Sequence, residues 1–443
     1  MKNLFIYCFV TSFLISCGNS DTQRKRGKKD NPPANLAATT SLNPDIKPVV
    51  NVYIENSASM DGYVEGVTEF EQAIYNYLSD IKISDFTDEL NMFYINSQII
   101  PHGSDIVDFI ENLEPSTFRQ RGGNRGTTDI SNVFKAILAE TKENDMAILI
   151  TDGIFSPGRG IDAQQYLVNQ QIGIKNTMAE YLKVLPNSAI VVYQLSSQFK
   201  GIYFNREDRP TRIDAQRPYY IWVVGNVANI AMLKSLVPET KFKGSGIQHS
   251  FSLLPSIEKG INYAILSSPK IGSFDRQTSS GGGCSRKKDD ANPKTSIYNI
   301  KKETKGVHNG IFMFTIGIDL YQFSILLGDE YLMNTESYAI LINKLPNSDY
   351  LIEMEHNTNP NTDYTHNMKL TTDKISFGDL DIMLQNNFPD WVLEINDDEG
   401  FDIYQNNAMN KTFGIKYLVE GIYEAYQMRG NTFYSTMKFN LKK

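Results

Sequence analysis

Cysteine, histidine and tryptophan are scarce in this sequence: its 443 residues include three cysteines, five histidines and two tryptophans. Cys8 lies in an apolar N-terminal segment and Cys17 directly follows that segment, which leaves Cys284 as the only cysteine in the rest of the chain. A disulfide framework is therefore not expected, and the fold must be held by its apolar cores. The histidines show no metal-ligand spacing such as His-x-x-x-His, so no histidine metal centre is predicted. They are His102, His249, His308, His356 and His366.

The patterns of several catalytic sites are missing as well. Residues 122–128 lack the lysine that a phosphate-binding loop places before its hydroxyl residue. No nucleophile elbow of the form Gly-x-Ser-x-Gly occurs where a strand would lead into a helix. The formal net charge is −8, so nucleic acid is not an expected partner. After the N-terminal segment, no apolar run is long enough to cross a membrane.

The N-terminus has the pattern of a secretory signal, with Lys2 as its one positive charge and an apolar run over residues 4–14. The sequence Leu-Ile-Ser-Cys-Gly that ends at Gly18 resembles a bacterial lipobox. The resemblance implies that residues 1–16 are a lipoprotein signal peptide and that Cys17 is acylated, for example with palmitate. Several acyl chains on one residue anchor a protein stably to a membrane of the cell envelope. The alternative is an ordinary signal peptide that contains a cysteine by chance.

Residues 17–46 are polar, low in aromatic residues and rich in Asn, Pro, Thr and Lys. Such a composition cannot bury enough apolar surface to form a core, so we expect a flexible tether. Residues 24–29 form a basic run within it. We interpret this run either as a contact with anionic lipid headgroups or as an ordinary solvated charge run.

Residues 47–240 alternate short apolar runs with segments of helical periodicity. Strands are expected at 49–54, 90–95, 146–150, 189–195 and 219–224, and helices at 69–81, 106–113, 129–141, 163–185 and 227–237. This alternation predicts a Rossmann-like α/β domain whose mostly parallel sheet is covered by helices on both faces. Residues 197–217 interrupt the alternation, and we expect them to form a hairpin or a loop insertion.

Residues 245–443 have a different pattern and are expected to form a mostly β, sandwich-like domain of α+β character. Strands are expected at 261–266, 311–318, 338–342, 350–354, 391–395 and 432–441, separated by turns rich in Asn, Asp, Pro and Gly. Residues 415–426 have helical spacing, and the glycine-rich residues 279–293 are expected to be a loop.

Oxygen-bearing side chains follow several of the expected strands in the first domain. Glu55, Ser57 and Ser59 come after the first strand, Thr128 precedes a helix, and Asp152 follows the central strand. Ligands of open α/β sheets collect at the carboxyl ends of the strands. An oxygen-only set of hydroxyls and carboxylates suits Mg²⁺, or Mn²⁺ or Ca²⁺ in its place.

These stretches resemble the von Willebrand factor A family. Glu55-x-Ser57-x-Ser59-Met-x-Gly62 parallels the family's Asp-x-Ser-x-Ser signature, with Glu in the place of the usual Asp. The Gly-Thr-Thr-Asp sequence at 126–129 parallels its threonine loop, and the Thr-Asp-Gly sequence at 151–153 parallels its third element. The resemblance implies that Ser57, Ser59 and Thr128 lie near a metal, with Glu55 and Asp152 as outer carboxylates. The other possibility is that the serines only form a turn and hold no ion.

The leading hypothesis is a lipoprotein without enzymatic activity that binds a protein or other macromolecular partner at this face. A carboxylate of the partner would complete the coordination of the metal. Arg121 and Arg125 are interpreted either as a rim that attracts an acidic partner or as part of a solvated loop. Two rival hypotheses remain: a metal-free scaffold subunit of an envelope complex, and a metal-dependent hydrolase that activates a bound water.

Overall fold

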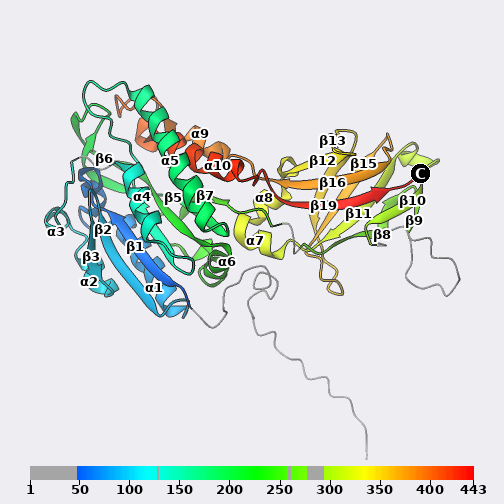
Figure 1. The fold of residues 1–443 in the computed structure, drawn as a ribbon, viewed down its shortest axis with the longest axis horizontal. Helices are drawn as coiled ribbons and strands as arrows, with labels where there is room; N and C mark the ends of the chain where they lie inside the picture. Colours follow the sequence, from blue (N-terminus) through cyan, green and yellow to red (C-terminus); the bar gives the residue numbers. More distant parts are fainter. Residues whose placement is uncertain (1–46, 127–128, 258–260, 277–293) are drawn as a thin grey trace, which may run out of the picture. The chain divides into compact units, whose positions relative to one another are not determined.

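The computed structural model describes residues 47–126, 129–257, 261–276 and 294–443 (Figure 1). The expected signal peptide, Cys17 with its expected lipid, the tether at 17–46, Thr128 and the whole loop at 279–293 lie outside the described residues. No helix within the described ranges combines the length and the apolar character that a membrane crossing needs.

The first part of the chain builds a seven-stranded sheet in the order β3-β2-β1-β4-β6-β5-β7. Its middle is parallel, because β1 pairs in parallel with both β2 and β4. These strands were expected from apolar runs, and β4 is buried along its whole length. The strands are β1 (Val49–Glu55), β2 (Glu89–Ile95), β3 (Ile99–Gly103), β4 (Met146–Thr151), β5 (Ser188–Phe204), β6 (Pro210–Asn226) and β7 (Ile247–Leu253).

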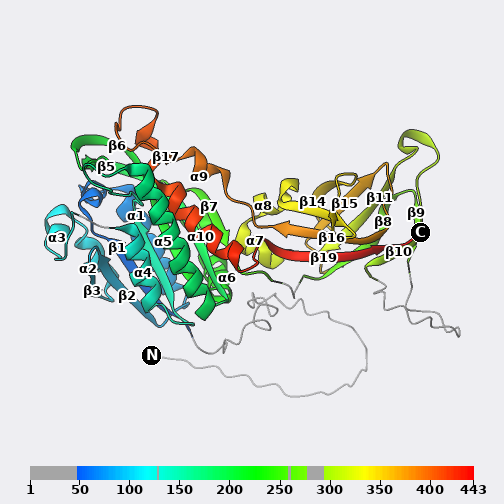
Figure 2. The same ribbon diagram turned by 45° about the horizontal axis from the view of Figure 1, so that its top comes forward.

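Helices cover both faces of this sheet, as expected for an α/β fold (Figures 1 and 2). One face packs against α1 (Glu69–Ile83) and α6 (Val227–Leu236), the other against α4 (Ile130–Glu140) and α5 (Ala163–Val184). The short helices α2 (Ile106–Glu111) and α3 (Pro115–Arg119) follow β3. Side-chain caps begin α1, α4, α5 and α6: Asp129, for example, accepts hydrogen bonds from the second and third residues of α4.

The expected mostly parallel sheet holds only for the β2-β1-β4 portion. Residues 219–224, predicted as a further strand of the alternation, belong to β6, which runs antiparallel to both β4 and β5. No helix connects β5 to β6. The turn between Phe204 and Pro210 is too short for a crossover, so the chain returns antiparallel beside β5. The expected hairpin at 197–217 is therefore confirmed, and it is the outer part of one long two-stranded ribbon.

The second part of the chain builds two sheets, in the orders β13-β12-β16-β19-β10-β9 and β14-β15-β11-β8. Apart from the β10–β19 pair, their strands pair antiparallel, as expected. Buried side chains of both sheets belong to one core, which continues from the α1 and α6 face of the first sheet. The strands are β8 (Tyr263–Ile271), β9 (Ser273–Arg276), β10 (Ser296–Lys301), β11 (Phe312–Ile318), β12 (Tyr338–Ile342), β13 (Leu345–Pro346), β14 (Leu351–His356), β15 (His366–Thr372), β16 (Gly378–Gln385) and β19 (Phe433–Leu441).

Two expectations for this part are wrong. Residues 391–395 are not a strand: Trp391 lies in the helix α9 (Asp390–Glu394), which starts after Pro389 and buries Val392 on one side. The expected domain boundary near residue 245 does not separate the first sheet and its helices from the two later sheets either. β7 is an edge of the first sheet, and α10 (Ile415–Met428) packs against α5.

The contact between α10 and α5 is close and specific. A Cβ atom on Gly421 would lie 2.7 Å from the backbone oxygen of Gln171, so only glycine fits this crossing. Glu424 accepts a hydrogen bond from the Gln171 side chain at 2.8 Å and forms an ion pair with Lys175 at 2.7 Å. The helix α10 therefore completes the layer of helices on the α4 and α5 face. The remaining elements are α7 (Tyr321–Leu327), α8 (Asp329–Met333), β17 (Asn396–Asp397) and β18 (Thr412–Phe413).

Candidate functional site

The candidate site begins where two neighbouring strands end. β1 ends at Glu55 and β4 at Thr151, and the parallel register pairs Ile54 with Ile150. Glu55 and Asp152 therefore follow adjacent strands at the same edge of the sheet, where α/β folds bind ligands. After Glu55 the chain turns at Ser57 into a short 3-10 helix, η1 (Ala58–Val64).

The side chains of this edge are buried and close to one another. Glu55, Ser57 and Asp152 expose 4%, 5% and 1% of their surface. The hydroxyl oxygens of Ser57 and Ser59 lie 2.9 Å apart, within hydrogen-bonding distance. The Thr151 hydroxyl donates to the Glu55 carboxylate and accepts from the backbone N–H of Gly153 at 2.9 Å.

Asp152 is only half satisfied by the residues around it. Its Oδ1 accepts a hydrogen bond from the backbone N–H of Ile154 at 3.1 Å. Its Oδ2 is buried and accepts no hydrogen bond of normal geometry in the described part of the chain, although the Ser59 hydroxyl lies near enough to favour the charged form of the carboxyl. An unpaired buried carboxylate oxygen is costly, so this atom indicates a place where a further group can bind.

The pKa values of both carboxyl groups respond to burial. Burial and the neighbouring Asp152 raise the pKa of Glu55 to about 8, although hydrogen bonds from Thr151 and Ser57 oppose the shift. Burial raises the pKa of Asp152 as well, while Ser59, the Ile154 N–H and Arg217 favour its charged form. Two carboxylates this close cannot both stay charged in a dry site at low cost. The pair needs a proton, a bound cation or a nearby positive side chain.

Arg217 supplies such a positive charge, and it was not predicted. It exposes only 2% of its surface and donates through Nη1 to the carbonyl oxygens of Ala408 and Met409, at 2.8 and 2.9 Å. Its guanidinium also lies over the Tyr203 ring, 5.1 Å from the centroid. Its position on β6 lies far from the three motifs in sequence, and no local pattern marks it. Only the long β5–β6 hairpin brings it near Asp152.

A pocket of about 190 Å³ opens beside the loop after β1, and neither Asp152 nor Arg217 is among the described residues that line it. Glu55, Ser57 and Ser59 line one side of it, and Asp208 from the turn of the β5–β6 hairpin lines another. The space is large enough for a divalent cation that keeps part of its water shell. The hairpin carries the exposed carboxylate of Asp208 to the same opening, which sequence spacing did not indicate.

The predicted rim arginines make internal contacts. Arg125 donates through Nε to the backbone and side-chain oxygens of Asn56, at 3.0 and 2.8 Å, and through Nη2 to the carbonyl of Ser57 at 3.0 Å. It also pairs with Asp61. Arg121 lies over the ring of Tyr94, 4.8 Å from the centroid. Arg125 therefore lines the pocket, but its main role is to hold the loop after β1 in place. It does not lie in a freely solvated loop.

Met60 and Gly62, which follow the serines in the resemblance, have structural roles. Met60 is fully buried in the core below η1. A Cβ atom on Gly62 would lie 2.4 Å from the Phe199 ring of the hairpin, so a larger residue would push the two elements apart. Gly62 therefore allows η1 to pack closely against the hairpin.

No family model matches this chain. No curated protein matches it either. The likeness to the von Willebrand factor A family therefore depends on the motifs and remains a prediction.

The donors around the pocket fit a hard cation only in part. Within the described ranges no group of three or more His, Cys, Asp or Glu side chains has the arrangement of a metal site. The structure brings together Glu55, Ser57, Ser59 and Asp152, while Thr128 lies outside the described residues. Two carboxylates, those of Glu55 and Asp152, and the two hydroxyls of Ser57 and Ser59 are a donor set that Mg²⁺ can use with additional waters.

Proposed function

We propose that this chain is a lipid-anchored envelope protein that binds a macromolecular partner through a divalent cation at the ends of β1 and β4. One observation carries the proposal: Glu55, Ser57 and Ser59 line an open pocket, and behind them the buried Asp152, whose charge acts on Glu55, has an Oδ2 that accepts no hydrogen bond of normal geometry from the described residues. The likeness to the von Willebrand factor A signature supports the same site.

Each residue has a distinct part in this proposal. Ser57 and Ser59 would offer hydroxyl oxygens directly, and Asp152 and Glu55 would hold coordinated waters and balance the charge. Thr128 would add a third hydroxyl. Mg²⁺ is the expected ion, with Mn²⁺ or Ca²⁺ as substitutes. A carboxylate of the partner would complete the shell from the side of the pocket.

A binding role is favoured over catalysis by the chemistry that lines the pocket. Its lining residues include carboxylates, hydroxyls and Arg125, with neither histidine nor lysine among those described. A hydrolytic site needs a general base that can accept a proton near neutral pH. Because Glu55 is tied to Thr151, it is poorly placed for that task.

The test is direct measurement of Mn²⁺ binding by electron paramagnetic resonance on the full-length protein. Wild type should bind one Mn²⁺ that Mg²⁺ displaces. Asp152→Asn and the double change Ser57→Ala, Ser59→Ala should each weaken binding at least tenfold, because the first removes a charge that holds coordinated waters and the second removes two hydroxyl ligands. Glu143→Gln, an exposed acidic residue away from the pocket, is the matched control. Binding that is equal in all four proteins contradicts the proposal.

A metal-free scaffold is the second candidate, and Arg217 favours it. With Glu55 protonated and Asp152 charged, the nearby guanidinium balances the site without any ion. In that case wild type should bind no Mn²⁺ at millimolar concentration. Arg217→Met would then lower the free energy of unfolding by about 3 kcal/mol, since it leaves a buried carboxylate and two carbonyls without a positive partner. The free energy of unfolding in urea, measured with and without Mg²⁺, distinguishes the cation-binding protein from the metal-free scaffold.

The membrane anchor is a separate proposal based on Cys17. Labelling with a radioactive or clickable palmitate should be lost in Cys17→Ala, and the variant should leave the membrane fraction. Cys284→Ala is the control because it changes the other cysteine downstream of the signal. Labelling that persists in Cys17→Ala excludes this anchor.

A further inference from the structure

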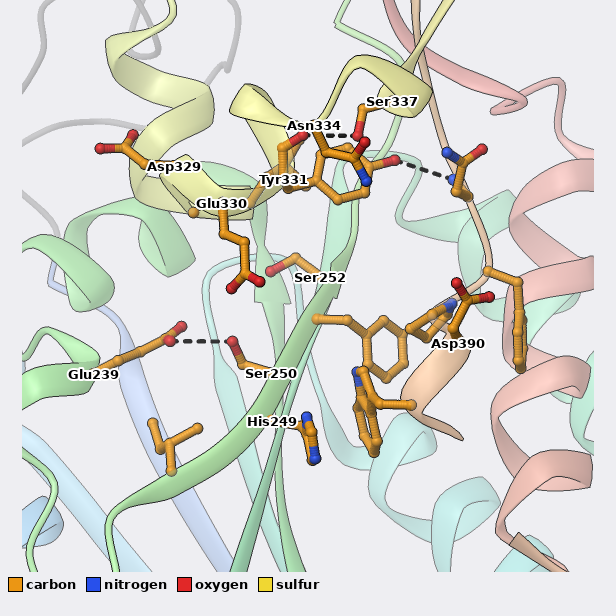
Figure 3. A pocket seen from close by; sticks show the side chains of 18 of the residues that line it. Glu239, His249, Ser250, Ser252, Asp329, Glu330, Tyr331, Asn334, Ser337 and Asp390 are labelled. Atoms are coloured by element: carbon orange, nitrogen blue, oxygen red, sulfur yellow. Dashed lines mark hydrogen bonds between the residues drawn. The ribbon is translucent and has the colours of Figure 1, made fainter. Parts of the chain in front are cut away.

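A second and larger cleft, of about 1200 Å³, lies beside β7 (Figure 3). It shares no lining residue with the pocket beside Glu55. Its walls are β7 itself, the segment around α8, and residues 387–391 before and within α9. Tyr434 closes part of its base and donates to the carbonyl of Ser252 at 2.8 Å. None of these residues belongs to the three stretches that resemble the von Willebrand factor A family.

β7 is the end strand of the first sheet. In the described part of the chain β5 is the strand paired with it, and its other edge faces the cleft. Residues 247–252 all line the cleft. An open strand edge presents backbone donors and acceptors that another extended chain can pair with.

The cleft is acidic. Its lining includes Glu239, Asp329, Glu330, Glu336 and Asp390, and neither lysine nor arginine is among the lining residues described. Glu239 is neutralised by Lys234 at 2.9 Å and accepts a hydrogen bond from Ser250 at 3.0 Å. The other four carboxylates form no ion pair with a described residue. Charges of one sign inside a concave site concentrate the field and favour an oppositely charged ligand.

Aromatic rings complete the wall next to α9. The rings of His249 and Trp391 stack with centroids 5.2 Å apart and an interplanar angle of 8°. Phe251 lies against the same indole at 5.8 Å. A flat aromatic surface beside carboxylates is a favourable contact for a guanidinium or ammonium group and for the aliphatic stem that carries it.

We propose that this cleft binds an extended, basic peptide segment of another protein as an added strand on β7. The edge of β7 before Ser252, whose carbonyl already accepts from Tyr434, would pair with the backbone of the segment, and alternate side chains of the segment would extend over the carboxylates. Arginine or lysine at every second position matches the charge of Glu330 and Asp390 on the two walls that Figure 3 shows. This partner site does not depend on the metal site.

The probe is a fluorescent decapeptide in which arginine alternates with threonine, measured by anisotropy with the full-length protein. Binding should saturate and should weaken as salt is raised. The double change Glu330→Gln, Asp390→Asn should weaken binding about tenfold, because it removes one charge from each wall. Glu111→Gln, Glu143→Gln is a matched control that removes the same charge elsewhere, and it should bind as wild type does.

Three further arms separate this mode from its alternatives. A peptide of the same sequence with every second amide N-methylated should bind about tenfold more weakly, because it cannot pair as a strand. Ser57→Ala should bind normally, which keeps a failure here distinct from a failure at the metal site. Spermine should compete poorly, since it has charge without a peptide backbone. The proposal is overturned if the arginine peptide does not saturate, if the double variant binds normally, or if the methylated peptide or spermine binds equally well.

Discussion

The hydroxyl of Thr151 donates a hydrogen bond to the carboxylate of Glu55 across the β1–β4 pair. This contact gives a physical reason for glutamate at the first position of the Glu-x-Ser-x-Ser motif. The extra methylene lets the carboxylate reach sideways to the next strand. The Glu55 carboxylate therefore contacts the neighbouring strand β4 as well as the pocket.

Replacing Glu55 with glutamine should make the protein more stable at alkaline pH. Burial raises the pKa of Glu55 to about 8, so the folded protein holds a proton that the unfolded chain releases above its ordinary pKa of 4.5. The unfolding free energy of wild type should therefore fall as pH rises from about 4.5 to 8. Glu55→Gln should show a shallower decline, because Asp152 and Glu71 still hold protons in the folded protein, and its stability relative to wild type should rise by about 4 kcal/mol between pH 4.5 and pH 8.

Urea unfolding at several pH values in EDTA measures this difference. Glu71→Gln is a useful comparison, because burial also raises the pKa of Glu71, to about 7, at a site with no second carboxylate. If wild type and Glu55→Gln decline in parallel between pH 5 and 8, Glu55 is ionised in the folded protein. Millimolar Mg²⁺ should flatten the wild-type decline if the cation replaces the proton.

Shortening Glu55 to aspartate should strengthen metal binding. The aspartate cannot reach the Thr151 hydroxyl as glutamate does, so its carboxylate stays nearer Ser57 and Ser59. Mn²⁺ affinity should rise roughly tenfold, while the free energy of unfolding should fall by about 1 kcal/mol for the lost methylene and hydrogen bond. Thr151→Val is the control, because it removes the hydrogen bond to Glu55 without shortening the Glu55 side chain. Weaker binding in Glu55→Asp would mean that the bond to Thr151 helps to orient the metal ligands.

Gly62→Ala should be destabilising by about 2 kcal/mol or more, because the new methyl group would overlap the ring of Phe199. The double variant Gly62→Ala, Phe199→Leu should recover part of this loss if the ring is the cause. Thermal unfolding of the four proteins in the cycle gives the coupling. Additive effects would contradict a direct clash between η1 and the β5–β6 hairpin.

A chain that ends at residue 244 should not fold stably. It lacks β7 and α10, and it would expose the apolar surface of α5 and β5 that these elements cover. We expect aggregation or a broad thermal transition. Circular dichroism and size-exclusion chromatography check this expectation against the full-length protein. A monomeric, cooperatively unfolding product would show that residues 47–244 form an independent domain.

Local sequence was sufficient for most individual elements of the fold. The apolar runs of β1, β2 and β4 and the periodicity of α1, α4, α5 and α10 identify those segments, because burial of one face leaves a repeating pattern. The pattern failed at residues 391–395, where four apolar residues suit a short helix as well as a strand.

The sequence by itself determined which oxygen-bearing side chains follow β1 and β4, since motif and strand ends coincide there. Only the tertiary structure decided that β6 lies antiparallel between β4 and β5, that Arg217 approaches Asp152, and that α10 returns to α5. Those relationships join residues up to hundreds of positions apart, and no local pattern records them. They arise from how whole elements cover one another's apolar faces, which is a property of the folded chain and not of any segment in it.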